Sequence, residues 1–306
     1  MPAPPPRRTG APRRAAAWAA AAAVALGGCG EAAPPADGTG AAPARSSDRA
    51  TAGGTAGGSV ATTKLPVYWV GGADGEQLLF REFRDPPEGS RAADPIAAAA
   101  ELMTAAAPED PDYRSLWNAV DRIGSSTSPD GTITVDLPDD AFRQDLAAED
   151  ARLALQQLAH TVAAAARTAG LLPEGSRPQV VLLVDGRPHE EVFGSVRLGE
   201  PVRPDEQLEA PVWLVDPQEG TRSDGRLALS GRVLEGVRDC EWTVTAKDDD
   251  GTVAGGPVTV VPAQGRPAEF RAEVDLPPGE YVVSVIGRDA EGGPVRDDKD
   301  VVVGAP

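Results

Sequence analysis

The chain has 306 residues, of which 25% are charged, 41% are hydrophobic and only 4% are aromatic, and its formal net charge is −18 at pH 7. So negative a chain repels phosphate backbones, which argues against nucleic acid as a partner. Two histidines and two cysteines leave few zinc ligands and few side chains for nucleophilic catalysis.

The first 28 residues have the organisation of a secretory signal peptide. Arginine pairs at 7–8 and 13–14 precede an apolar run over 15–28, and the first acidic residue is Glu31. The run is about 14 residues long, whereas a membrane-spanning helix needs about 20. We therefore predict a cleaved signal peptide over 1–28 and leave the export route, Sec or twin-arginine, open.

The run ends on Leu26-Gly27-Gly28-Cys29, which resembles a bacterial lipobox. In that motif the cysteine is lipidated and becomes the new N-terminus, and the alternative is an ordinary signal peptide with an incidental cysteine. Two or more acyl chains, palmitate among them, would hold the protein stably at a membrane. We expect lipidation at Cys29 and residence on the extracytoplasmic face of the cell membrane. Cleavage would remove four arginines and no acid, taking the net charge from −18 to −22.

Residues 29–63 are rich in Gly, Ala, Pro, Ser and Thr and contain almost nothing large and apolar. Such a composition cannot bury a core, so we predict a disordered tether. With Cys29 lipidated, Cys240 lacks an intramolecular partner and is interpreted as a small buried apolar residue, with an intermolecular disulfide as the alternative.

Residues 64–205 alternate strand and helix signals. Two apolar runs around a Gly-rich turn predict a hairpin over 65–83. Asp94 and Pro95 predict the start of a first helix, with Ile96, Ala99 and Met103 on its buried face. The remaining predictions are a strand over 131–138, a helix over 148–170 with Leu155, Leu158, Val162 and Ala166 on its apolar stripe, and a buried strand over 178–186. This order favours an α+β layer with two helices on one face of a small sheet.

Residues 206–306 contain no helical pattern but about seven short apolar runs between turn signals, which predict a β-sandwich. One of these runs is "GPVTVVP" (256–262). Gly279 and Tyr281 fit a tyrosine corner, and Trp242 is predicted to lie in the core.

Taken together, "VYWVGGADGEQLLFREF", "DPIAAAAELM", "GTITVDLPDDAF", "QLAHT" and "VVLLVDG" resemble the GerMN domain. That module occurs in spore-germination lipoproteins and actinobacterial envelope lipoproteins. The tail, from "PVWLVDPQEG" through "LSGRV" and "VTAKDDDGTVAGG" to the last valines, resembles Gmad2, the immunoglobulin-like domain often joined to GerMN. The sequence departs from the usual pattern at "PEDPDYRSLWNAVDRIGSSTSPDG" (108–131). The resemblance implies association rather than catalysis, without cofactor or metal.

The residues agree with a non-enzymatic function. His160 lies in the second predicted helix and His189 in a turn, and no Gly-x-Ser-x-Gly motif occurs. "KDDDG" (247–251) lacks the spacing of a calcium loop and is interpreted as a hairpin turn with solvated acids. "RDDKD" (296–300) is likewise interpreted as charged residues beside the last strand. The acids at 139–140 and at 190–191 are adjacent pairs, and adjacent side chains face opposite sides of a strand. They therefore do not indicate the paired carboxylates of a glycosidase. Tyr68, Trp69 and Trp117 could contribute to a small surface patch, but a stacking platform is not indicated.

Our first hypothesis is a lipid-anchored envelope lipoprotein that binds an envelope protein or copies of itself, for example by strand addition at an open sheet edge. The alternative is a binding module for a cell-wall polymer, such as peptidoglycan, or for a small ligand. The sequence does not identify the partner or the pathway.

Overall fold

The computed structural model describes residues 64–72, 77–87, 94–248, 251–263 and 266–304. The predicted signal peptide, the lipidation site Cys29 and the tether lie outside these residues. Chain contacts group 59–306 into one compact unit, and this unit holds two hydrophobic cores. No helix in the described part of the chain is long and apolar enough to cross a membrane.

The first domain begins with the predicted hairpin. Strands β1 (Leu65–Gly71) and β2 (Leu78–Arg84) pair antiparallel, with Trp69 opposite Phe80. Every residue of β1 is buried, so this strand packs on both faces. Part of the predicted turn lies outside the described residues.

Helices α1 (Pro95–Ala105) and α2 (Ala148–Thr168) form the centre of this domain. The Asp94 carboxylate caps α1 by accepting from the backbone N–H of Ala97 at 2.9 Å, and Pro95 begins the helix, both as predicted. The predicted stripe residues of both helices are buried. Gly170 adopts φ +68° after the end of α2, a backbone conformation that glycine adopts without steric penalty.

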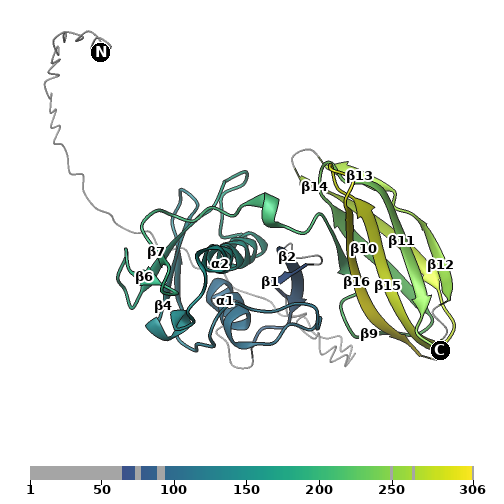
Figure 1. Ribbon diagram of the computed structural model, residues 1–306, viewed down its shortest axis with the longest axis horizontal. Coiled ribbons are helices and arrows are strands. Elements are labelled where there is room, and N and C mark those ends of the chain that lie inside the picture. Colours follow the sequence, from purple (N-terminus) through teal and green to yellow (C-terminus); the bar gives the residue numbers. More distant parts are fainter. Residues whose placement is uncertain (1–63, 73–76, 88–93, 249–250, 264–265, 305–306) are drawn as a thin grey trace, which may run out of the picture. The chain divides into compact units, whose positions relative to one another are not determined.

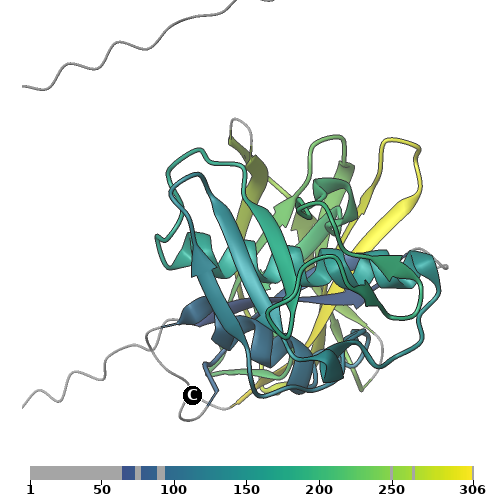
Figure 2. The same cartoon turned by 90° about the vertical axis from the view of Figure 1, so that its left-hand side faces the viewer.

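A second sheet orders its strands β3–β4–β5, from β3 (Gly124–Thr127), β4 (Thr132–Leu137) and β5 (Gln179–Val184). Strand β4 pairs antiparallel with β3 and parallel with β5. The helices lie between this sheet and the β1–β2 hairpin, so they have strands on two sides (Figure 1). Figure 2 shows the three-stranded sheet in front of the helices. The α+β class is as predicted, but the strands form separate sheets on two sides of the helices rather than one small sheet with both helices on one face.

The first domain also contains the short helix η1 (Asp139–Phe142) and a small hairpin of β6 (Glu191–Val192) and β7 (Val196–Arg197). Residues 203–210, here called the connector, lead to the second domain and include the short helix η2 (Glu206–Leu208).

The second domain is a β-sandwich, as predicted. Its four-stranded sheet has the order β13–β14–β10–β8 and its five-stranded sheet the order β12–β11–β15–β16–β9. The bounds are β8 (Val212–Asp216), β9 (Thr221–Ser223), β10 (Arg226–Val233), β11 (Arg238–Ala246), β12 (Thr252–Pro257), β13 (Val260–Ala263), β14 (Arg266–Asp275), β15 (Gly279–Arg288) and β16 (Pro294–Val303).

The tyrosine corner is confirmed, because the Tyr281 hydroxyl donates to the Pro277 carbonyl at 2.8 Å. A Cβ at Gly279 would lie only 3.0 Å from that hydroxyl, so the small residue makes room for the ring. Trp242 packs against the sandwich core but is only partly buried, which corrects its predicted core position. The run at 256–262 is not one strand, because β12 ends at Pro257 and β13 begins at Val260.

The aromatic residues of the first domain do not form a surface patch. Tyr68, Trp69 and Trp117 are all buried in the first core. Trp117 comes from the segment that departs from the usual GerMN pattern, and its ring contacts Phe142 and Phe193 edge-on at 5.2 and 5.1 Å. This segment therefore supplies core residues rather than a free loop.

Candidate interaction edge and buried polar clusters

Several sheet edges of the described chain are covered by other parts of the protein. At Tyr68 the outer edge of β1 faces α2: its N–H donates to Thr161 Oγ1 and its carbonyl accepts from Gln157 Nε2, both at 3.0 Å. At Val70 the same edge exchanges two backbone hydrogen bonds with Arg114. Helix side chains and a loop thus replace a neighbouring strand.

The next edges are covered as well. The connector covers β2, since Ala210 N–H donates to the Leu79 carbonyl at 3.0 Å. Val202 exchanges backbone hydrogen bonds with Val180 and so covers β5. On β8, Leu214 N–H donates to Asp297 Oδ2 at 2.7 Å.

Strand β12 is different. Among the described residues it pairs with β11 alone and ends its sheet. Its six residues, Thr-Val-Ala-Gly-Gly-Pro, carry no charge, although charged side chains are a common protection of edge strands. Val253 is 49% exposed, one of two large hydrophobic residues exposed to this degree in the described chain. The other edge strands for which the described residues show no cover are shorter, with four residues in β3 and in β13, three in β9 and two in β6 and in β7. We therefore define β12, 252–257, as the candidate interaction edge.

One of the two glycines of β12, Gly255, has a structural reason. Gly256 lies opposite Trp242 in the register, and a Cβ there would meet the indole ring at about 3.5 Å, an ordinary contact. A Cβ at Gly255 would approach the Trp242 carbonyl to 3.0 Å. Because the two glycines have no side chains, the backbone of this edge is accessible to another chain.

A first polar cluster binds the connector to the first domain. The His160 ring is buried, with Nδ1 3.0 Å from Glu209 Oε1 and Nε2 3.0 Å from the Asp205 carbonyl oxygen. The Tyr68 hydroxyl donates to the same Glu209 oxygen at 3.2 Å. Burial opposes ionisation of Glu209, but the hydrogen bond and charge of His160, together with Arg81, outweigh it and lower the pKa of this carboxyl.

The polar groups of this cluster are engaged with one another and with the connector. Both nitrogens of His160 are engaged by acceptors, and burial raises the pKa of the Tyr68 hydroxyl, which stays protonated as a donor. Gln156 adds two hydrogen bonds to the connector, at Arg203 and Asp205. The sequence placed His160 on the helix correctly, but its connector partners come from almost 50 residues away.

A second polar cluster joins the two domains. Lys299 Nζ lies 2.5 Å from Asp110 Oδ2, 2.9 Å from Asp297 Oδ1 and 2.7 Å from the Tyr113 hydroxyl oxygen. Asp297 also accepts from the Tyr113 hydroxyl and from Leu214 N–H, each at 2.7 Å. Asp297 and Lys299 belong to the "RDDKD" run, which lies within β16 rather than beside the last strand, and both residues are buried.

Burial and charge act on this second cluster in opposite directions. Burial raises the pKa of Asp297 although Lys299 opposes it, and burial also raises the pKa of the Tyr113 hydroxyl. For Lys299, burial would lower the pKa, but Asp297 and Asp110 outweigh it and raise the pKa. Glu82 is buried beside the cluster and accepts from the backbone N–H of Asp110 at 2.9 Å.

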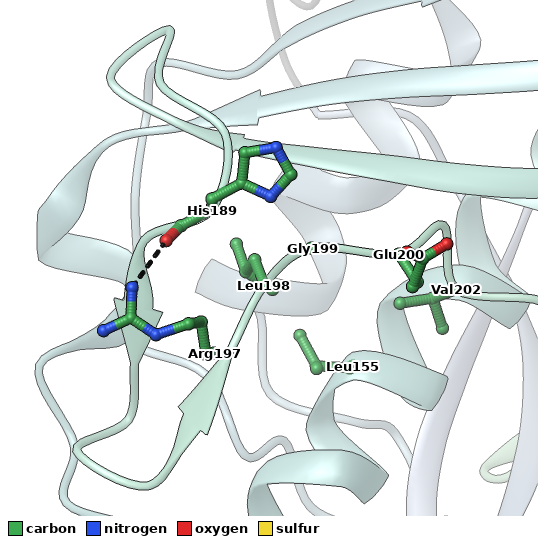
Figure 3. Close-up of a pocket in the computed structure, with 7 residues that line it drawn as sticks. All are labelled: Leu155, His189, Arg197, Leu198, Gly199, Glu200 and Val202. Carbon is green, nitrogen blue, oxygen red and sulfur yellow. Dashed lines mark hydrogen bonds between the residues drawn. The ribbon is translucent and has the colours of Figure 1, made fainter.

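A shallow hollow of about 460 Å³ lies on the first domain (Figure 3). Leu155, Leu198, Gly199 and Val202 line it, with His189, Arg197 and Glu200 at its polar positions. Figure 3 shows Arg197 turned to the His189 carbonyl, to which it donates at 3.2 Å, and it also pairs with Glu191 at 3.6 Å. Because Arg197 is occupied in this way, the hollow offers no convergent set of polar groups.

The remaining candidate residues stay apart. His189 is exposed and adopts φ +64° in its turn. Cys240 is a free thiol, only partly buried, and burial raises the pKa of its thiol. Within the described ranges no group of three or more His, Cys, Asp or Glu side chains is placed to hold a metal ion. Asp249 and Asp250 of the "KDDDG" turn lie outside those ranges.

The first domain is similar to a known protein family. Residues 66–190 match the family model Germane, described as sporulation and spore germination. This segment is similar to the Germane family. The match covers the Germane-like domain up to the β5 turn and does not extend to the sandwich.

Solved structures add resemblances of low similarity. The first GerMN domain of the sporulation protein GerM from Bacillus subtilis is 16% identical, covering 47% of this chain and 96% of that one, with a TM-score of 0.34. The tandem GerMN domains of the same protein are 20% identical, covering 51% of each chain, with a TM-score of 0.34. CopC from Methylosinus trichosporium OB3b is 19% identical over 31% of this chain and 94% of its own, with a TM-score of 0.25. No curated protein sequence matches the chain.

Proposed function

We propose that this protein is a lipid-anchored envelope lipoprotein whose Germane-like and sandwich domains act as a non-catalytic interaction module, with β12 as the contact edge. The observation that carries the proposal is the open, uncharged edge of β12 in a molecule that covers β1, β2 and β5. Main-chain hydrogen bonds to an added strand would satisfy the exposed edge. The match to a sporulation and spore germination family supports an envelope role, and the lipobox ending at Cys29 supports membrane attachment.

The edge is tested by adding a charge to it. Val253→Lys places a lysine on an exposed position of β12, where it disfavours pairing with another strand. In-cell cross-linking at native abundance should recover an envelope partner or oligomer from the wild-type protein and several-fold less of it from the variant. Leu171→Lys is the matched control, because Leu171 is 44% exposed but lies in the first domain.

The outcomes separate the hypotheses. Equal recovery from both variants would move the contact away from β12, and a wild-type protein that remains monomeric without any partner would contradict the proposal. Retention on purified cell wall, unaffected by Val253→Lys, would favour a polymer-binding module instead.

The anchor is tested separately. Mass spectrometry of the mature N-terminus should show an acylated Cys29, and Cys29→Ala should abolish acylation and release the protein from membranes. A wild-type N-terminal peptide that begins elsewhere without lipid would refute this part of the proposal.

A further inference from the structure

The Lys299–Asp110 contact between the two domains has the features of a reaction site as well as those of an ion pair. Lys299 Nζ and Asp110 Oδ2 are in direct contact at 2.5 Å. The side chains of Lys299, Asp110 and Asp297 are only 3%, 5% and 3% exposed. Amine and carboxyl are therefore held together in a site from which water is largely excluded.

The two carboxylates of the cluster are not equivalent. Asp297 is saturated, since its oxygens accept from Lys299, the Tyr113 hydroxyl and Leu214 N–H. Asp110 Oδ1 accepts from Asp112 N–H at 2.9 Å, while Oδ2 accepts from Lys299 Nζ and from no other group in the described part of the chain. Asp110 is thus the carboxyl available for reaction, and Asp297 is placed to carry protons.

We propose that Lys299 and Asp110 form an intramolecular isopeptide bond that joins the two domains covalently. The ammonium of Lys299 passes a proton to Asp297 Oδ1, and the nitrogen lone pair then attacks Cγ of Asp110. A new C–N bond forms while the Cγ–Oδ2 bond breaks, and the departing oxygen takes up the relayed proton and a second proton from Nζ, leaving as water. An ammonium and a carboxylate thus become one amide and one water, with no other reactant.

Three features of the surroundings favour this condensation. Holding the reacting groups in contact corresponds to a high effective concentration, on the order of 10⁵ M or more in well-oriented systems. The Tyr113 ring, centred 4.5 Å from Nζ and stacked on Phe80 at 4.8 Å, covers the lysine. The reaction also reduces the buried formal charges on Lys299, Asp110 and Asp297 from three to one, which lessens the cost of their desolvation.

The backbone holds Asp110 in place for the reaction. Glu82 is 1% exposed and accepts from the N–H groups of both Glu109 and Asp110, at 3.0 and 2.9 Å. Arg84 in turn contacts Glu82 at 3.2 Å. The loop that presents the electrophile is therefore fixed by the hairpin of the first domain.

The protein contains its own negative control. Lys247 and Asp300 also form an ion pair, but their side chains are 37% and 45% exposed. Water is freely available to this pair, so the same condensation is not expected there. Any chemical procedure that joins lysine to aspartate indiscriminately would modify both pairs.

The test is mass spectrometry of the folded, full mature protein. Digestion should yield a branched peptide that joins Lys299 to Asp110, lighter by one water than the two separate peptides and missing the tryptic cleavage at Lys299. Lys299→Arg keeps the positive charge and the fold but should lose the branched peptide completely. Asp297→Asn keeps both reacting groups, and the fraction of joined chains should fall several-fold.

The branched peptide decides the outcome, and a mass loss of one water alone does not. Cyclisation at an Asp-Gly sequence also removes one water but gives no branched peptide. Wild-type protein held in denaturant from synthesis onward should contain no branch. If folded wild-type protein yields only the separate peptides of 110 and 299, the proposal is overturned and the cluster is an ion-pair network. A branch at Lys247 with equal yield would overturn it as well.

Discussion

Replacing Thr161 by valine tests how the first domain covers the edge of β1. Thr161 is fully buried, and its Oγ1 accepts from the N–H of Tyr68, itself 4% exposed. Valine preserves the shape of the side chain and has a similar helix propensity, so the change removes the acceptor and little else. The Tyr68 N–H is left buried without a partner, which costs about 1 to 3 kcal/mol.

Urea unfolding and thermal unfolding, each followed by far-UV circular dichroism, measure this loss. For a unit of this size, about 1 kcal/mol corresponds to about 2 to 4 °C in Tm, so Thr161→Val should melt roughly 2 to 12 °C below the wild type. Thr168→Val, at the exposed end of the same helix, should change the free energy of unfolding by no more than about 0.5 kcal/mol. If the two variants are equally stable, the hydrogen bond to β1 does not support the fold and the reasoning fails.

Three further substitutions test other contacts. The lowered pKa of Glu209 means that its stabilisation is present above its unfolded pKa, about 4.3, and is lost as pH falls through the lower folded value. Glu209→Gln should therefore cost about 1.5 to 3 kcal/mol at pH 7, and this cost should shrink as the pH falls below about 4.3, measured by melting across pH. Tyr281→Phe removes the bond to Pro277 and should cost about 0.5 to 1.5 kcal/mol in urea unfolding. In Gly231→Ala, the new Cβ would lie 2.3 Å from ring atoms of Phe270, so overpacking should cost about 1 to 3 kcal/mol or more in the same assay.

Matched controls separate these effects from general damage. Glu206→Gln changes an exposed acid of the same connector and should change the free energy of unfolding at pH 7 by no more than about 0.5 kcal/mol. A Cβ at Gly304 would have its nearest contact at 3.6 Å, so Gly304→Ala should be well tolerated. A Gly231→Ala protein of wild-type stability, or a pH-independent cost for Glu209→Gln, would contradict the packing and charge assignments.

Local signals made the individual elements predictable. Asp94 and Pro95 marked the start of α1, and alternating apolar residues marked β4, because capping and strand alternation act over a few residues. The tyrosine corner was also predictable, since Tyr281 and its acceptor Pro277 are four residues apart. The assembly of strands into separate sheets was not predictable, because it depends on contacts between residues far apart in the sequence.

The two polar clusters show the same limit. The first-domain partners of Lys299 are 186 and 189 residues away, and no local pattern brings them together. A weaker signal was present in β16, where the period of two places Asp297 and Lys299 on the same face as the buried Val301 and Val303. This alternation could have predicted that the two charged residues are buried, although not which residues they contact.

The position of β8 has a practical consequence for dissecting the protein. Val212 and Leu214 belong to the sandwich core, whereas Trp213 between them belongs to the core of the first domain. A fragment that stops before β8 would leave a hole where the indole was, and a fragment that starts there would display that indole to solvent. Half-molecules made by cutting near residue 205 are therefore expected to aggregate, and studies of either half are better done on the intact chain.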